Sequence, residues 1–142
     1  MQRRSDAPDA APDALRRRIM QAVKSKNTVP ELIVRRALHA AGFRFRLHRR
    51  DLSGRPDLTF PGRRKVIFVH GCFWHGHDCP RGSRVPKTNT AYWVAKVARN
   101  QARDEKNRLE LEKGGWEVMV IWECAARGAS GFVNSASRFL MT

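Results

Sequence analysis

Residues 66–79 read VIFVHGCFWHGHDC, a stretch that joins an apolar run to a cluster of metal-binding side chains. The apolar run at its start is typical of a short buried strand. Three of the chain's five histidines and two of its three cysteines follow within positions 70 to 79. Metal ligands, proton-transfer groups and bulky aromatic residues rarely share so short a stretch for packing reasons alone. We therefore expect this stretch to organise both the fold and the chemistry.

A metal site is the first function that this stretch predicts. Cys72, His77 and Cys79 have a C-x4-H-x-C spacing, which lets one folded-back loop hold an ion. Cys124 is the only other cysteine and lies just past a second apolar region, residues 116–122. A Cys3His site is closed to water, so we expect a structural zinc ion; the alternative is buried or free thiols. Shared ligands would bring the ends of the two apolar runs together, which predicts parallel neighbouring strands joined by a long helix.

The charge predicts a polyanionic partner. The chain has 142 residues, of which 42% are apolar, and 28 Lys+Arg against 13 Asp+Glu give a formal net charge of +15. Nucleic acid is the first candidate for the partner and an anionic membrane surface the second. No apolar run could span a bilayer, and the N-terminus has no signal-peptide core. We therefore expect a cytoplasmic protein without a disulfide framework.

The pattern of apolar residues predicts one α/β domain over residues 14–142, preceded by a flexible tail over residues 1–13. Helices are expected over 14–25, 30–41, 91–113 and 132–141, and strands over 43–47, 58–60, 66–69 and 116–122. The helix over 14–25 carries the Arg16–Arg18 cluster, which either faces phosphates or forms a solvated surface. This order of elements predicts a central mixed β-sheet flanked by helices.

The helix over 30–41 begins at a capping-box pattern, Thr28-Val29-Pro30-Glu31. Its predicted buried stripe consists of Ile33, Ala37, Leu38 and Ala41. Glu31 is open to two interpretations, since it either caps the helix or contributes an acid to an active site.

A catalytic centre is expected around Asp57, which ends the sequence Gly54-Arg55-Pro56-Asp57. A four-residue turn over 61–64 would pair Phe60 with Lys65 and place Asp57 beside Val69 and His70. A carboxylate next to a free backbone carbonyl suits Mg2+, and His70 and His75 could position water and transfer protons around a phosphate. The alternative is that Asp57 is a turn residue and that His70 forms a hydrogen bond at a strand end.

Aromatic residues near the basic surface predict contacts with nucleic acid. Phe73 and Trp74 lie between the predicted zinc ligands, and Trp93 follows a basic loop. Exposed aromatic side chains can stack on bases or insert between base pairs. Core packing is the alternative, and it is the better interpretation for Trp116 and Trp122.

Three blocks of residues carry a resemblance to a known family: Gly54 to Asp57, Val66 to His75, and Trp122-Glu123-Cys124. In order and spacing the chain resembles the very-short-patch-repair (Vsr) DNA mismatch endonucleases from about residue 20 to residue 127. The resemblance implies a restriction-endonuclease-like fold with a structural zinc site. It implies Mg2+-dependent nicking of one strand on the 5′ side of the T in a T·G mismatch. Such a mismatch arises when 5-methylcytosine is deaminated, and the nick would start very short patch repair.

The resemblance also implies roles for individual residues. Asp57 resembles the catalytic metal-binding aspartate, and the Val69 backbone carbonyl resembles a second Mg2+ ligand. His70 and His75 resemble the histidines that activate water and assist the leaving group. Glu31 resembles an acidic residue near the same site. The implied zinc ligands are Cys72, His77, Cys79 and Cys124. The implied DNA-inserting aromatics are Phe73, Trp74 and Trp93. The implied partners are double-stranded DNA with a T·G mismatch and mismatch-repair proteins of the MutL type. The protein itself is expected to be a monomer that associates with the nucleoid.

The chain departs from the family pattern at three positions. Val69 stands where threonine is expected, and Gly76 and Asp78 interrupt a run of histidines. Two other functions stay open at this point. One is a zinc-stabilised DNA-binding protein without catalysis, and the other is a restriction-type nuclease that cuts both strands of paired DNA.

Overall fold

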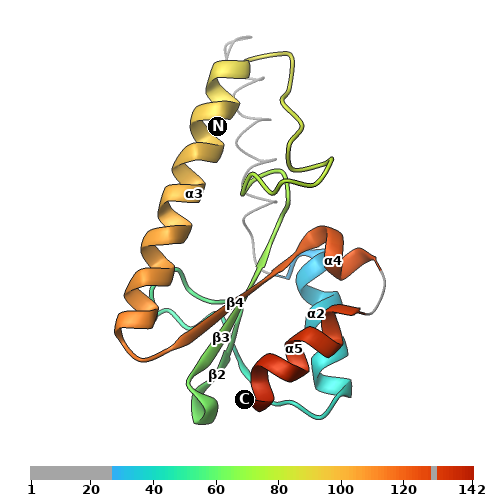
Figure 1. Cartoon of the computed structure of the whole chain (residues 1–142), viewed down its shortest axis with the longest axis vertical. Coiled ribbons are helices and arrows are strands. Elements are labelled where there is room, and N and C mark those ends of the chain that lie inside the picture. The colour runs from blue at the N-terminus through green and yellow to red at the C-terminus, as the bar shows by residue number, and fades with distance from the viewer. Residues whose placement is uncertain (1–26, 129–130) are drawn as a thin grey trace, which may run out of the picture.

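The computed structural model describes residues 27–128 and 131–142, so the predicted tail and the helix over 14–25 lie outside the described residues. Its centre is a four-stranded mixed sheet in the order β1-β2-β3-β4 (Figure 1). The strands are β1 (Arg46–Leu47), β2 (Leu58–Phe60), β3 (Lys65–His70) and β4 (Glu117–Trp122). β1, β2 and β3 are antiparallel, whereas β3 and β4 run parallel. The predicted parallel pairing of the two apolar runs is therefore confirmed.

The hairpin between β2 and β3 has the predicted register. A short 3-10 helix, η1 (Pro61–Arg63), and the left-handed residue Arg64 form the turn. Phe60 pairs with Lys65 and Leu58 with Ile67. Extending this register by one pair places Asp57 opposite Phe68, next to the C-terminal end of β3. The hairpin thus brings Asp57 next to the strand end that precedes the predicted metal-binding residues.

Helices cover both faces of the sheet (Figure 1). One face packs against α2 (Val29–Ala40), α4 (Glu123–Arg127) and α5 (Gly131–Met141) around a core that includes Val34, Leu38, Leu58, Phe60, Ile67, Ile121 and Leu140. The other face packs against α3 (Thr90–Lys113) through a smaller core of Val66, Phe68, Leu111 and Trp116. The N-terminal half of α3 extends past the sheet beside the chain over 71–89. None of the helices in the described part of the chain is long and apolar enough to cross a membrane.

Some predicted details are wrong. The buried face of α2 consists of Pro30, Glu31, Val34 and Leu38. It is rotated from the predicted stripe because Glu31 faces the end of the sheet. β1 contains only Arg46–Leu47 instead of residues 43–47, since the three-residue strand β2 pairs with no more of it. The short helix α4 was not predicted. Trp122 does not join either core but stacks on His77, with ring centroids 4.2 Å apart.

Candidate active site

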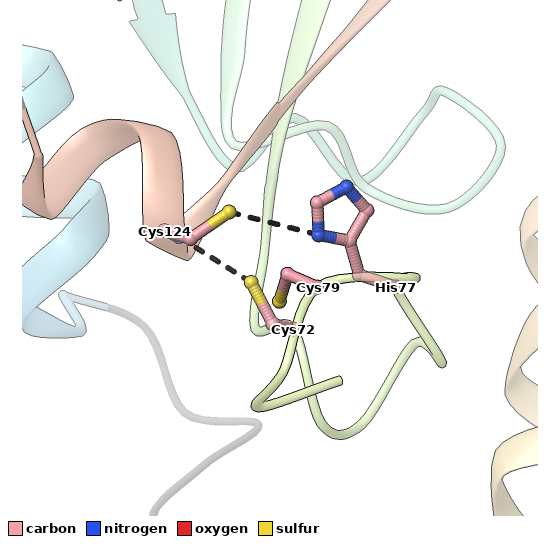
Figure 2. Close-up of side chains that lie close together, drawn as sticks. All are labelled: Cys72, His77, Cys79 and Cys124. Carbon is pink, nitrogen blue, oxygen red and sulfur yellow. Dashed lines mark hydrogen bonds between the residues drawn. The ribbon is translucent and has the colours of Figure 1, made fainter. Parts of the chain in front are cut away.

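The predicted thiol cluster forms at the ends of β3 and β4. One ligand atom from each of Cys72, His77, Cys79 and Cys124 lies within 4.8 Å of all the others (Figure 2). The Cys124 Sγ lies 3.6 Å from His77 Nδ1, and the Cys124 backbone N–H donates to Cys72 Sγ at 3.3 Å. All three cysteines are free thiols. Ligands of a tetrahedral zinc ion are separated by roughly 3.8 Å when Zn–S bonds measure about 2.3 Å. The cluster therefore has the donor set and the dimensions for zinc.

Contacts within the loop over residues 72–82 affect the thiols and the backbone of the Cys/His cluster. Burial raises the pKa of the Cys72 thiol to about 12, whereas the Gly82 N–H, which donates to Cys79 Sγ at 3.3 Å, lowers the pKa of the Cys79 thiol to about 7. A Cβ atom at Gly82 would lie 2.0 Å from the His77 carbonyl oxygen. Only glycine permits this close approach of two backbone segments.

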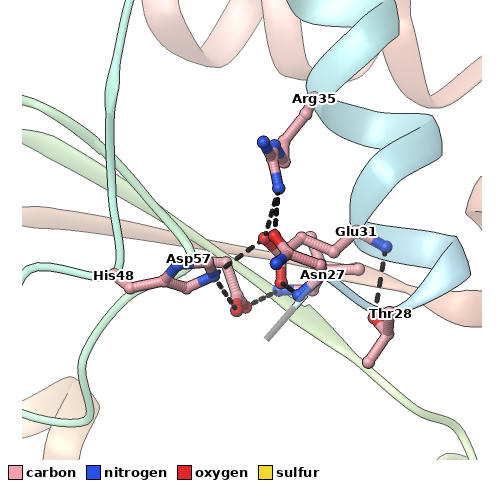
Figure 3. Close-up of polar contacts among 7 residues, drawn as sticks. Asn27, Thr28, Glu31, Arg35, His48 and Asp57 are labelled. Atoms are coloured by element: carbon pink, nitrogen blue, oxygen red, sulfur yellow. Dashed lines mark hydrogen bonds and ion pairs between the residues drawn. The ribbon is translucent and has the colours of Figure 1, made fainter. Parts of the chain in front are cut away.

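A second cluster lies at the other side of β3, where Glu31, His48 and Asp57 meet (Figure 3). Asp57 Oδ2 accepts a hydrogen bond from the Val69 N–H at 2.7 Å. His48 Nε2 lies 2.8 Å from Glu31 Oε2 and 4.0 Å from Asp57 Oδ1. Glu31 also accepts from the Asn27 N–H at 3.2 Å, and its own N–H donates to Thr28 Oγ1 at 3.4 Å. Thr28 is the N-cap of α2, and the Glu31 carboxylate accepts from the N–H one residue before this cap while it also lies in the Asp57 cluster.

The carboxyl group of Asp57 is strongly perturbed. Burial raises its pKa, the hydrogen bond from the Val69 N–H lowers it, and the neighbouring Glu31 carboxylate raises it; the combined result is a pKa of about 7. Two carboxylates in a partly dehydrated site repel each other, and a bound cation relieves this repulsion. Arg35 offsets part of this repulsion, because its Nη1 lies 3.3 Å from Glu31 Oε2, and a divalent cation would offset more of it.

The backbone carbonyl of Val69 is available on the same side. In a β-strand the N–H and C=O of one residue point to the same neighbour, so the Val69 carbonyl points toward Asp57 together with its N–H. Continuing the β2–β3 register places Pro56 opposite Val69. Proline has no N–H and cannot donate to this carbonyl. The sequence Arg55-Pro56-Asp57 thus supplies a carboxylate and leaves an oxygen ligand unpaired across the ladder.

The third cluster contains the two histidines and an acid from α3. The rings of His70 and His75 are stacked in parallel, 3.8 Å apart, and His75 Nδ1 lies 2.5 Å from Asp104 Oδ2. Asp104 Oδ1 also lies 4.0 Å from His70 Nε2. Burial and, to a smaller extent, the neighbouring His75 lower the pKa of His70 to about 3. His70 is therefore neutral near pH 7. A hollow of about 250 Å³, lined in part by His70, His75 and Asp104, leaves room beside the pair.

The two polar clusters share the end of β3 but do not merge. Asp57 contacts Val69, and His70 is the next residue, yet neighbouring side chains of a strand point to opposite faces. Within residues 27–128 and 131–142, neither a hydrogen bond nor an ion pair joins Asp57 to His70 or His75. The structure therefore brings Asp57 beside Val69, as expected, and sets His70 and His75 on the α3 side.

Sequence reasoning missed two members of these clusters. Asp104 lies 29 positions from His75 in the middle of a charged helix, and no local spacing distinguishes it from the neighbouring acid Glu105. His48 follows a basic strand and has a left-handed backbone with φ of 50°. The only signal for His48 was that histidine is one of the residues that tolerate this conformation.

The aromatic residues between the predicted zinc ligands form a cluster with α3. Phe73, Trp74 and Trp93 pack edge to face, with ring centroids 5.0 to 5.8 Å apart. All three side chains are half-buried. Asn100 fixes the loop by donating to the Trp74 carbonyl at 2.8 Å. The structure thus places the three predicted DNA-inserting residues together on the part of the molecule that extends past the sheet.

Comparisons with known proteins identify the family of the chain. The family model described as "DNA mismatch endonuclease Vsr" matches residues 8–81. The chain is 55% identical over 109 residues to "Type II nicking enzyme V.XorIIP" of Xanthomonas oryzae pv. oryzae, which covers 77% of this chain and 79% of that protein. It is 38% identical over 128 residues to "DNA mismatch endonuclease Vsr" of Escherichia coli K12, which covers 90% of this chain and 81% of that protein. With this match and its mixed α/β sheet, the chain belongs to the Vsr family of DNA mismatch endonucleases.

Proposed function

We propose that this protein nicks one strand of DNA on the 5′ side of the T in a T·G mismatch, with Mg2+ as its catalytic cation, and so starts very short patch repair. Membership of the mismatch endonuclease family supports the reaction class. The observation that carries the proposal is the position of Asp57, whose carboxylate lies beside the Val69 backbone at the end of β3.

The donor atoms around Asp57 fit a hard cation. The Asp57 carboxylate and the Val69 carbonyl would hold Mg2+, with the Glu31 carboxylate beside them, and all of these donors are oxygen atoms. When bound, Mg2+ would neutralise charge that develops on the scissile phosphate. The replacement of the expected threonine by valine at position 69 is compatible with this role, because the ligand is a backbone oxygen.

The histidine pair supplies the proton transfers. Asp104 holds Nδ1 of His75 and so fixes the direction of the opposite nitrogen, Nε2, which can accept a proton from an attacking water molecule. His70 is neutral, because burial lowers its pKa. A neutral imidazole retains one N–H, so His70 can donate a hydrogen bond to the departing 3′ oxygen without carrying a charge.

The thiol cluster would bind zinc for structural reasons. Cys72, His77, Cys79 and Cys124 provide four ligands, which leave no position for water or substrate. Three of the ligands come from the loop that holds Phe73 and Trp74. Zinc would therefore fix the aromatic cluster relative to the sheet, and the aromatic side chains would insert beside the mismatched pair.

A nicking assay on an end-labelled duplex tests the proposal. Matched and T·G duplexes of the same sequence are incubated with Mg2+ and with EDTA, and the labelled products are sized. We expect one nick, on the T strand, only in the mismatched duplex and only with Mg2+. Binding without a Mg2+-dependent nick would favour a DNA-binding protein, and equal cleavage of both strands in matched DNA would favour a restriction-type nuclease.

A further inference from the structure

His48 has a buried nitrogen with no hydrogen-bond partner among the described residues. The side chain is 12% exposed, and its Nε2 points to the two carboxylates of the Asp57 cluster (Figure 3). Although Nε2 lies 2.8 Å from Glu31 Oε2, the contact is not aligned as a hydrogen bond. A buried polar atom without a hydrogen bond is costly unless another ligand satisfies it.

The spacing of the three side chains matches one coordination sphere. Around an octahedral cation with bonds of about 2.1 Å, neighbouring ligands are roughly 3.0 Å apart and opposite ligands roughly 4.2 Å apart. His48 Nε2 lies 2.8 Å from Glu31 Oε2 and 4.0 Å from Asp57 Oδ1. A single ion could therefore contact the imidazole and both carboxylates with little movement of the side chains.

We propose that His48 Nε2 is a direct ligand in a divalent-cation site with Glu31 and Asp57. This nitrogen shifts the preference of the site from Mg2+ toward transition-metal ions, and Mn2+ is the ion used to test the shift. The inference rests on the proposed catalytic cation at Asp57 and adds a ligand to it. Imidazole is a better ligand for first-row transition metals than for Mg2+, which prefers oxygen donors and retains its water.

The backbone conformation of His48 indicates which residue can replace it. Its φ of 50° lies in the left-handed region, where asparagine is one of the few other residues that fit well. His48→Asn should therefore remove the imidazole while preserving the loop. The matched control is His39→Asn, which changes an exposed histidine near the end of α2.

The test measures Mn2+ binding to the full chain, not activity. Electron paramagnetic resonance gives the affinity from the loss of the free Mn2+ signal, and electron spin echo modulation detects a nitrogen bound to the ion. Mg2+ affinity is measured by competition. We expect nitrogen modulation in the unaltered chain and in His39→Asn but not in His48→Asn. We expect His48→Asn to weaken Mn2+ binding roughly tenfold or more and to change Mg2+ binding much less.

The variant Asp57→Asn separates this inference from the proposed function. If Asp57→Asn leaves Mn2+ binding unchanged, the cation site at Asp57 is wrong and both proposals fail. If Asp57→Asn abolishes binding while His48→Asn keeps both the affinity and the nitrogen modulation, only the role of His48 is refuted. An equal loss of Mn2+ and Mg2+ affinity in His48→Asn would refute the metal preference.

Discussion

Replacing the carboxylate of Asp57, the proposed catalytic metal ligand, should make the metal-free protein more stable. In Asp57→Asn the amide oxygen can still accept the Val69 N–H, while the buried charge next to Glu31 is removed. The pKa of Asp57 is raised from 3.8 to about 7, mainly by burial. Each pKa unit corresponds to about 1.4 kcal/mol, so ionising Asp57 at pH 8 destabilises the fold by up to about 4 kcal/mol. Asp57 is 23% exposed, which makes this value an upper limit.

The sign of the effect fixes the pH window. A carboxyl group with a raised folded-state pKa holds its proton more tightly in the folded protein than in the unfolded chain. The unaltered protein therefore loses stability as the pH rises from about 4 to about 7, and asparagine does not titrate. The advantage of Asp57→Asn should be largest above pH 7 and less than half as large at pH 5.

Urea denaturation in EDTA at pH 5 and pH 8 measures this difference. The control is Asp51→Asn, which changes an exposed carboxylate and should have little effect at either pH. Saturating Mg2+ should stabilise the unaltered protein and not Asp57→Asn, which should also lose nicking activity. The reasoning would be refuted if Asp57→Asn were less stable than the unaltered protein at pH 8 in EDTA, or if the difference did not change with pH.

The other predictions concern the remaining clusters. Cys124→Ser should lose bound zinc and lower the melting temperature, measured by metal analysis and thermal denaturation, because structural zinc contributes folding free energy; a variant that keeps one zinc and melts normally contradicts the four-ligand site. Asp104→Asn should slow single-turnover nicking about 100-fold with unchanged DNA affinity, because His75 loses its orienting acid; an unchanged rate excludes that role. Phe73→Ala should reduce the preference for T·G over matched duplex in a competition binding assay more than it reduces affinity for matched DNA. Equal losses on both duplexes would contradict insertion at the mismatch.

The parts of the fold that depend on local patterns were predictable. The hairpin register was predictable from the turn over 61–64. A four-residue turn pairs the residues on its two sides, Phe60 and Lys65, and this pair sets every other pair of the hairpin. The parallel pairing of β3 and β4 was predictable for a different reason. Cys72 and Cys124 can share an ion only if the two strand ends meet, and this condition selects the topology.

The residues that were missed depend on contacts between distant elements. Asp104 faces His75 because α3 packs across the sheet, and its sequence neighbours Arg103 and Glu105 look equally suited to a solvated helix surface. His48 approaches Glu31 because β1 ends there and the chain turns through a left-handed residue. The burial of Glu31 also explains why the predicted stripe on α2 was wrong, since a charged residue occupies the buried face.

The positions of Cys72 and Cys124 have a consequence for where the DNA is cut. These residues are 52 positions apart, and the whole of α3 lies between them. An ion that joined them would close a loop of this length, which in a chain-entropy model restrains the unfolded chain by roughly 4 kcal/mol. The closed loop carries the aromatic cluster, and its two ends follow β3, whose Val69 contacts Asp57, and the neighbouring strand β4. The distance between the aromatic cluster and Asp57 would then fix how many nucleotides separate the recognised mismatch from the broken phosphodiester bond.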